Sequence, residues 1–197
     1  MNKRGVLLFS MLAVVLMLGF TSGPAFAQPV GDASVYFVTY FSNNVPGAPA
    51  AVLRVINDGE SGANLYADYF VFDDSQELTE CCSCYVTPDG INSESVPVDL
   101  TANPLTGKVP TRGVIKVISS FNQGPGGAEP APGLHGFATH IQAGKTPGTY
   151  AITEAPLLDS NLVVEGEKNV LNYLCAYAFI LGSGAGQCYC TFEDNDF

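Results

Sequence analysis

Residues 65–72 read Leu-Tyr-Ala-Asp-Tyr-Phe-Val-Phe, a run in which aromatic and β-branched side chains predominate. This composition is typical of a β-strand. Similar runs recur along the chain, separated by clusters of Gly, Pro, Asn and Asp, which favour turns. The further predicted strands are residues 35–41, 51–56, 113–119, 134–142 and 149–153. Eight to ten short strands with regular turns predict a mainly β protein, a single-domain β-sandwich with immunoglobulin-like layers.

Four segments between or after these strands have a different expected structure. Residues 73–75 can cap one short helical turn over residues 76–80. Residues 91–100 suit an edge strand that tolerates Pro97. The remaining predictions concern the C-terminal part of the chain: a helix that begins near Ser160 with an apolar stripe, and a hairpin around the glycine-rich residues 182–186. The stripe comprises Leu162, Val163, Val170, Leu171 and Leu174, and the hairpin strands are residues 175–181 and 187–192.

Six cysteines follow the first three predicted strands in two groups. The first group is Cys81, Cys82 and Cys84, and the second is Cys175, Cys188 and Cys190. An even number of cysteines in an exported protein indicates three disulfides. Neighbouring cysteines rarely pair with each other, because their Cβ vectors diverge. We therefore expect bonds between the two groups, which six of the 15 possible connectivities satisfy.

The N-terminal residues resemble a secretory leader. Residues 2–4 form a short positive segment, residues 6–20 are almost wholly apolar, and Ala25-Phe26-Ala27 is a small-x-small cleavage site. We expect residues 1–27 to be a signal peptide, residues 28–197 to form one domain, and the protein to be secreted or periplasmic. No second long apolar run follows, so no membrane anchor is expected after cleavage.

The chain is acidic, with a formal net charge of -11 that becomes -13 once Lys3 and Arg4 leave with the leader. Nucleic acids and anionic membranes would be repelled at long range. An acidic, disulfide-bonded protein is instead expected to meet a protein or glycan partner outside the cytoplasm. The chain has no tryptophan, but its nine tyrosines can supply aromatic rings on which the sugar rings of a glycan could stack.

Other chemistry for the cysteines and histidines is disfavoured by spacing. The cysteine groups read C-C-x-C and C-x-C, whereas zinc sites usually contain two C-x2-C pairs, and no C-x-x-C redox motif is present. His135 and His140 are five residues apart, so on a strand they would face opposite sides. No G-x-S-x-G motif accompanies them. We therefore expect neither a metal, a cofactor nor a catalytic residue.

The segment between residues 122 and 133 is dominated by glycine and proline, which can form neither a helix nor a strand ladder. Exposed loops of this kind often carry recognition. We expect a binding loop in this region, and its candidate residues are Asn122, Gly124, Gly127, Glu129, Gly133 and His135.

The sequence also resembles a family of uncharacterised secreted bacterial proteins. The resemblance rests on residues 69–74 followed by Glu77, Leu78 and residues 80–84. It continues through residues 87–90, 99–106, 113–116 and 188–190, and so covers most of the expected mature chain. Some members have an additional cysteine near the position of Tyr66. The resemblance implies no activity, ligand or catalytic residue.

Two classes of function remain open from the sequence. The favoured class is an exported, non-enzymatic binding, adhesive or surface-assembly module. The alternative is an extracytoplasmic enzyme, hydrolase-like, whose site cannot be recognised from the sequence. A cleft that combines His135 or His140 with a carboxylate from another strand would favour the enzyme.

Overall fold

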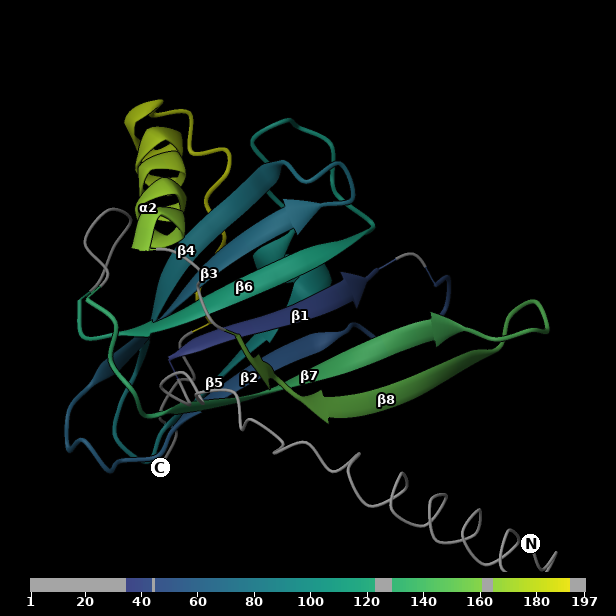
Figure 1. Ribbon diagram of the computed structural model, residues 1–197. Helices are drawn as coiled ribbons and strands as arrows, with labels where there is room; N and C mark the ends of the chain where they lie inside the picture. The colour runs from purple at the N-terminus through teal and green to yellow at the C-terminus, as the bar shows by residue number, and fades with distance from the viewer. Residues whose placement is uncertain (1–34, 44, 123–128, 161–164, 192–197) are drawn as a thin grey trace, which may run out of the picture. The chain divides into compact units, whose positions relative to one another are not determined.

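The computed structural model arranges nine strands of its described residues in two antiparallel sheets (Figure 1). It describes residues 35–43, 45–122, 129–160 and 165–191. The first sheet, sheet A, has the order β4-β3-β6-β1-β9, and the second, sheet B, has the order β5-β2-β7-β8. All described residues belong to one compact unit, Gly31–Phe197. The predicted leader, residues 1–27, lies outside the described residues.

The strands of sheet A come from four regions of the chain. They are β1 (Tyr36–Ser42), β3 (Leu65–Asp73), β4 (Leu78–Val86), β6 (Arg112–Ser120) and the short β9 (Leu158–Asp159). Sheet B comprises β2 (Val52–Asn57), β5 (Ile91–Ser95), β7 (Leu134–Ala143) and β8 (Tyr150–Pro156). A π-helical turn, η1 (Val96–Leu100), follows β5, and one α-helix, α2 (Glu165–Ile180), lies beside β4 (Figure 1).

The main core lies between the two sheets. On β3, Leu65, Ala67, Tyr69 and Val71 face this core, because alternate residues of a strand point to the same side. Leu53 and Val55 of β2 meet them from sheet B. The sequence prediction of a mainly β, disulfide-linked sandwich is confirmed, while the immunoglobulin-like layering stays a prediction.

A second, smaller core lies on the other face of sheet A, under α2. Phe70 of β3, Ile118 of β6 and Cys81 of β4 pack there against Leu171 and Cys175 of the helix. Because β3 is covered on both faces, it reads as an almost continuous apolar run without alternation. The helix therefore makes a third layer over one half of the sandwich.

The predicted helical turn at residues 76–80 is wrong. Asp73 does act as a cap, but its Oδ1 accepts hydrogen bonds from the amides of Ser75 (2.8 Å) and Glu77 (3.0 Å) in a hairpin turn. Gln76 adopts a left-handed backbone, φ 68°, which ends any helical path. The chain turns back and enters β4 at Leu78, so the first cysteine group lies on a strand.

Two other predicted elements differ from the structure. Residues 91–100 form an edge strand only as far as Ser95, and the π-helical turn then contains Pro97. The predicted C-terminal hairpin is wrong, since residues 175–180 continue α2. Apolar side chains keep helical spacing past Cys175, and residues 187–191 return along the edge of β4, where Gln187 forms a parallel bridge with Cys81.

Candidate functional site

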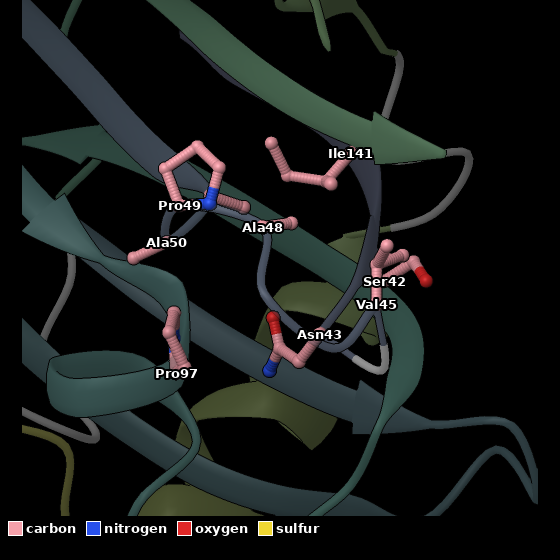
Figure 2. Close-up of a pocket in the computed structure, with 9 residues that line it drawn as sticks. Ser42, Asn43, Val45, Ala48, Pro49, Ala50, Pro97 and Ile141 are labelled. Carbon is pink, nitrogen blue, oxygen red and sulfur yellow. The ribbon is translucent and has the colours of Figure 1, made fainter. Parts of the chain in front are cut away.

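Two cavities and one exposed apolar surface of the described part of the chain are candidate sites for a partner or ligand. The larger cavity, about 310 Å³, lies where β1 ends and the chain turns toward β2 (Figure 2). The smaller, about 60 Å³, lies between α2 and β4. Neither cavity is lined by His135 or His140.

The three disulfides all join β4 to the C-terminal part of the chain. Cys81 faces the helix layer and bonds to Cys175 of α2, with the Cα atoms 5.9 Å apart. Cys82 and Cys84 share the opposite face of β4 and bond to Cys188 and Cys190, at Cα separations of 5.2 and 5.3 Å. The predicted pairing between the two cysteine groups is confirmed.

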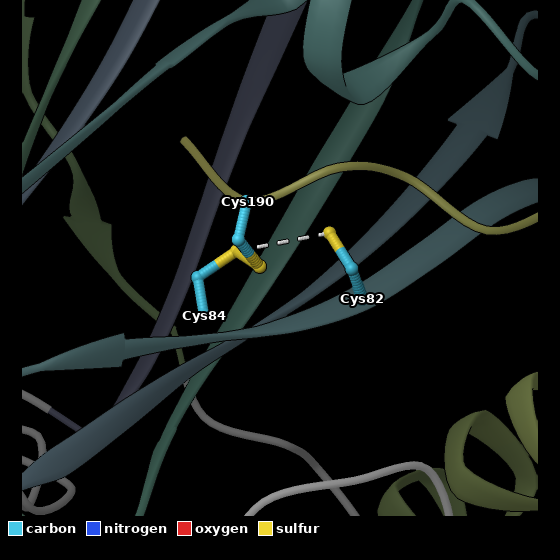
Figure 3. Close-up of side chains that lie close together, drawn as sticks. All are labelled: Cys82, Cys84 and Cys190. Atoms are coloured by element: carbon cyan, nitrogen blue, oxygen red, sulfur yellow. Dashed lines mark hydrogen bonds between the residues drawn. A yellow bond between two sulfur atoms is a disulfide. The ribbon is translucent and has the colours of Figure 1, made fainter. Parts of the chain in front are cut away.

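The sulfur atoms of Cys82, Cys84 and Cys190 lie together in a space where a metal ion would fit by distance alone, all within 4.8 Å of one another (Figure 3). Each of them is committed to a disulfide. A metal requires thiolates, which these cysteines cannot supply while oxidised. The cluster is therefore structural, and the three intramolecular disulfides of the chain are consistent with an oxidising compartment outside the cytoplasm.

Residues 186–191 close the side of the sandwich where β4 and β5 are the edge strands. The amide of Cys81 donates to the carbonyl of Gly186 (2.9 Å), and the amide of Cys188 donates to the carbonyl of Cys81 (3.2 Å). On the side of β5, the amide and hydroxyl of Thr191 donate to the Glu94 carboxylate at 2.9–3.0 Å. This segment, which we call the closing segment, thus links the two sheets.

The helix α2 has two apolar stripes, of which only one is covered. Leu171, Cys175 and Ala178 are buried against sheet A, at the spacing expected for one helix face. A second stripe, the outer stripe, faces solvent, with Tyr173 70% exposed and Ile180 80% exposed. The outer stripe comprises Val170, Tyr173, Leu174, Tyr177 and Ile180, with Leu181 directly after the helix.

The outer stripe lies in a stretch without charge. Residues 169–191 contain no Asp, Glu, Lys or Arg. The nearest described ion pair on the helix is that of Glu167 with Lys116 of β6, in the first turn. Isolated exposed apolar residues are common, but six at helical spacing on one face are characteristic of a binding surface.

The smaller cavity opens beside the outer stripe. Leu174, Tyr177 and Ala178 line it from the helix, and Glu80 lines it from β4. Glu80 is only 1% exposed; its Oε1 accepts a hydrogen bond from the amide of Asn103 at 2.9 Å, while its Oε2 has no partner in the described structure. Burial raises the pKa of this carboxyl to about 7, against the lowering effect of the Asn103 amide.

The predicted binding loop is only partly described. Gly124 and Gly127 lie outside the described residues. Asn122 is exposed and its Nδ2 donates to Glu129 (3.4 Å), whereas Gly133 is buried and its carbonyl accepts from the Asp58 amide at 2.9 Å. His135 is exposed and lies 3.1 Å from Asp58. Of the described candidates, Gly133 and His135 contact Asp58 in the turn after β2, whereas Asn122 and Glu129 contact each other, and none of the four lines either of the two cavities above.

His140 has a different environment from His135. Its ring stacks on Tyr40 with centroids 4.0 Å apart, and its Nε2 lies 3.0 Å from the Thr39 hydroxyl. Burial lowers the pKa of His140 and so favours the neutral ring. These contacts join β1 to β7, which gives His140 a structural role between the sheets.

The predicted helix stripe combines both faces of α2: Leu171 is buried, whereas Val170 and Leu174 belong to the outer stripe. Leu162 and Val163 lie outside the described residues. The strand predicted for residues 175–181 hides the rest of the outer stripe. The available signal was the helical spacing of Tyr173, Tyr177 and Ile180, which continues from Val170 without a break.

No helix of the described residues combines the length and the apolar character needed to cross a membrane. Comparison with protein-family models, with curated proteins and with solved structures finds no match to this chain.

Proposed function

We propose that the protein is an exported, non-enzymatic assembly module, secreted or periplasmic, that associates with a second copy of itself through the outer stripe of α2. The observation that carries this proposal is the exposure of six apolar side chains on a helix that a disulfide fixes to the sandwich. A rigid, preorganised surface loses little conformational entropy when it binds.

The size of the outer stripe suits a pair of copies. With roughly 200 Å² for a large apolar side chain, the exposed fractions of the six residues amount to on the order of 700 Å². A standard interface buries about 800 Å² per partner. The outer stripe with its immediate rim therefore supplies about the area that a stable dimer needs.

Charge and symmetry also favour a second copy. Two uncharged stripes can meet without desolvating any charge. A two-fold axis between residues 175 and 176 would set Leu174 against Tyr177 of the second copy, and Val170 against Leu181 of the second copy. The charged first turn of each helix would then lie beside the uncharged loop that follows the other helix.

Sedimentation of the oxidised protein tests this proposal. We expect a two-copy species for the wild type, and association at least about tenfold weaker for Ile180→Glu and for Tyr177→Glu, because each variant places a charge in the apolar interface. The matched control is Ile152→Glu on β8, where an isoleucine is 50% exposed, as Tyr177 is, but lies outside the outer stripe. It should associate like the wild type.

Two results would contradict the proposal. One is a wild-type protein that sediments as a single copy at about 0.5 mM, a concentration well above the dissociation constants of standard-size interfaces. The other is an Ile152→Glu variant that weakens association as much as Ile180→Glu does. Co-sedimentation of a monomeric wild type with phosphatidylcholine vesicles, lost in Ile180→Glu, would assign the outer stripe to lipid instead.

A further inference from the structure

The amide of Asn43, the residue directly after β1, has an orientation that its neighbours fix. Its Nδ2 lies 2.9 Å from the Thr101 hydroxyl oxygen. That hydroxyl donates its single hydrogen to the carbonyl of Val96 at 2.8 Å, so toward Asn43 it can only accept. The nitrogen of the amide must therefore face Thr101, and the oxygen must face the other way.

The Oδ1 atom of Asn43 has no hydrogen-bond partner among the described residues. It is also buried. Figure 2 shows the Asn43 oxygen directed toward Ala48, into the space that the cavity residues surround, with the nitrogen on the opposite side. Buried carbonyl oxygens almost always have a donor, so this atom marks a place where a donor belongs.

The cavity is uncharged, and its lining is of mixed character, because polar and apolar surface contribute about equally and Ser42 lies in the wall beside Asn43. Its walls come from the segment between β1 and β2, from η1 and from β7, and no charged residue is among those that line it. Its volume of about 310 Å³ is that of a small-molecule site rather than of a single water. The apolar lining comprises Val45, Ala48, Pro49, Ala50, Pro97 and Ile141.

We infer that this cavity binds a small, uncharged molecule with an apolar body and one hydroxyl or N–H donor, which Asn43 Oδ1 accepts. An ionised ligand would lose its hydration without gaining an opposite charge. A ligand with acceptors only would fill the space but leave Asn43 Oδ1 unpaired. The inference is independent of the assembly proposed for α2, because no residue of the outer stripe lines this cavity.

A matched pair of probes tests this inference. Cyclohexanol and cyclohexanone have nearly the same shape, but only the alcohol can donate. In amide-resolved NMR titrations of the oxidised protein, we expect cyclohexanol to cause saturable shifts in residues 42–51 and at Ile141. We expect its dissociation constant to be at least about fivefold lower than that of the ketone, the margin of one hydrogen bond.

Two variants locate the binding. Ala50→Leu adds a side chain at the solvent-facing wall of the cavity and should raise the dissociation constant of cyclohexanol at least about tenfold. Ser61→Leu, in the turn between β2 and β3, adds a leucine away from the cavity residues and should leave binding unchanged. Linear shifts up to about 50 mM alcohol, beyond the millimolar range expected of such small fragments, would overturn the inference. So would equal affinity for the two probes, or equal effects of the two variants.

Discussion

Glu94 is a charged residue without any exposed surface, and its hydrogen bonds explain why the core tolerates it. Asn92 Nδ2 donates to its carboxylate at 2.8 Å, and the amide and hydroxyl of Thr191 donate at 2.9–3.0 Å. Burial is the largest influence and raises the pKa of Glu94, while these donors act in the opposite direction. A single carboxylate thus connects β5 to the closing segment.

Replacement of Glu94 by alanine should lower the free energy of unfolding by about 2–4 kcal/mol, because it removes a fully buried side chain and the acceptor that Asn92 and Thr191 share. Urea denaturation of the oxidised protein measures this change. Glu60→Ala, at an exposed turn position, is the matched control and should change stability by less than about 0.5 kcal/mol. Equal effects of the two substitutions would contradict the role given to Glu94.

Gly113 lies near the start of β6, where two strands and an aromatic ring approach closely. A Cβ atom at this position would lie 1.9 Å from the carbonyl oxygen of Phe72 and 2.8 Å from the ring of Phe41. Gly113→Ala should therefore cost several kcal/mol, on the order of 3 or more, because backbone must move. Gly47→Ala, with open space but φ 78°, should cost only about 1 kcal/mol of backbone strain. Thermal unfolding of both variants distinguishes steric conflict from strain.

At the scale of elements, the helix α2 is attached to sheet A by a small apolar cluster and by one disulfide, and we expect the disulfide to contribute more. The second core contributes only Leu171, Cys175 and their neighbours under the helix, while the outer stripe favours contact with other molecules. The Cys81–Cys175 bond keeps the helix in place across a sequence separation of 94 residues. The surface proposed for assembly is thus held by one covalent link.

The double variant Cys81→Ser, Cys175→Ser should release α2 and leave the sandwich intact. We expect hydrogen exchange of the α2 amides to accelerate at least about tenfold, whereas the amides of β3 and β6 keep their protection, because these strands belong to the main core. Hydrogen-exchange mass spectrometry measures both. Unchanged protection of α2 would show that packing alone holds the helix.

The strands were predictable from sequence where residue composition and flanking turns indicate the same element. Residues 35–41, 65–72 and 113–119 combine β-branched and aromatic residues with clear turns, and each became a strand within two residues of its predicted ends. β4 was missed because its cysteines and Glu80 hide the alternation of buried and exposed positions. Residues 175–181 were misassigned because the glycine-rich loop after them is compatible with a hairpin turn as well as with a helix end.

The candidate sites were less predictable than the fold. The orientation of Asn43 depends on its hydrogen bond to Thr101, which is 58 residues away. The hydrogen bonding of Glu94 depends on Thr191, which is 97 residues away. A local sequence pattern cannot predict these hydrogen bonds, because the two residues of each pair come together only when the sheets pack. The disulfide pairing was an exception, because the geometry of adjacent cysteines excludes most connectivities before any fold is known.

At the scale of the whole molecule, buried carboxyls should make stability depend on pH. Burial raises the pKa of Asp68 from 3.8 to about 7, although the hydroxyls of Ser83 and Ser120 oppose it, and raises the pKa of Glu80 from 4.5 to about 7. Between about pH 4 and pH 7 the folded protein therefore holds more protons than the unfolded chain. Stability must then rise as the pH falls through this range.

We expect the free energy of unfolding to increase by a few kcal/mol, roughly 2–4, between pH 8 and pH 5, since each pKa unit corresponds to about 1.4 kcal/mol before solvent screening. Urea denaturation across this range provides the measurement. The variant Asp68→Asn, Glu80→Gln should show a flatter profile. A wild-type protein that is more stable at pH 8 than at pH 5 would contradict the assignment.

The closing segment and the three disulfides also order the events of folding in time. Every native bond joins a cysteine at or before residue 84 to one at or after residue 175. A chain that has emerged only as far as residue 174 has three adjacent thiols and no correct partner for any of them. Oxidation must wait for the last part of the chain, and any earlier bond among residues 81–84 must be reshuffled over seconds to hours. Maturation of this protein should therefore need a disulfide isomerase, in addition to the oxidant that accepts the electrons released as the three bonds form.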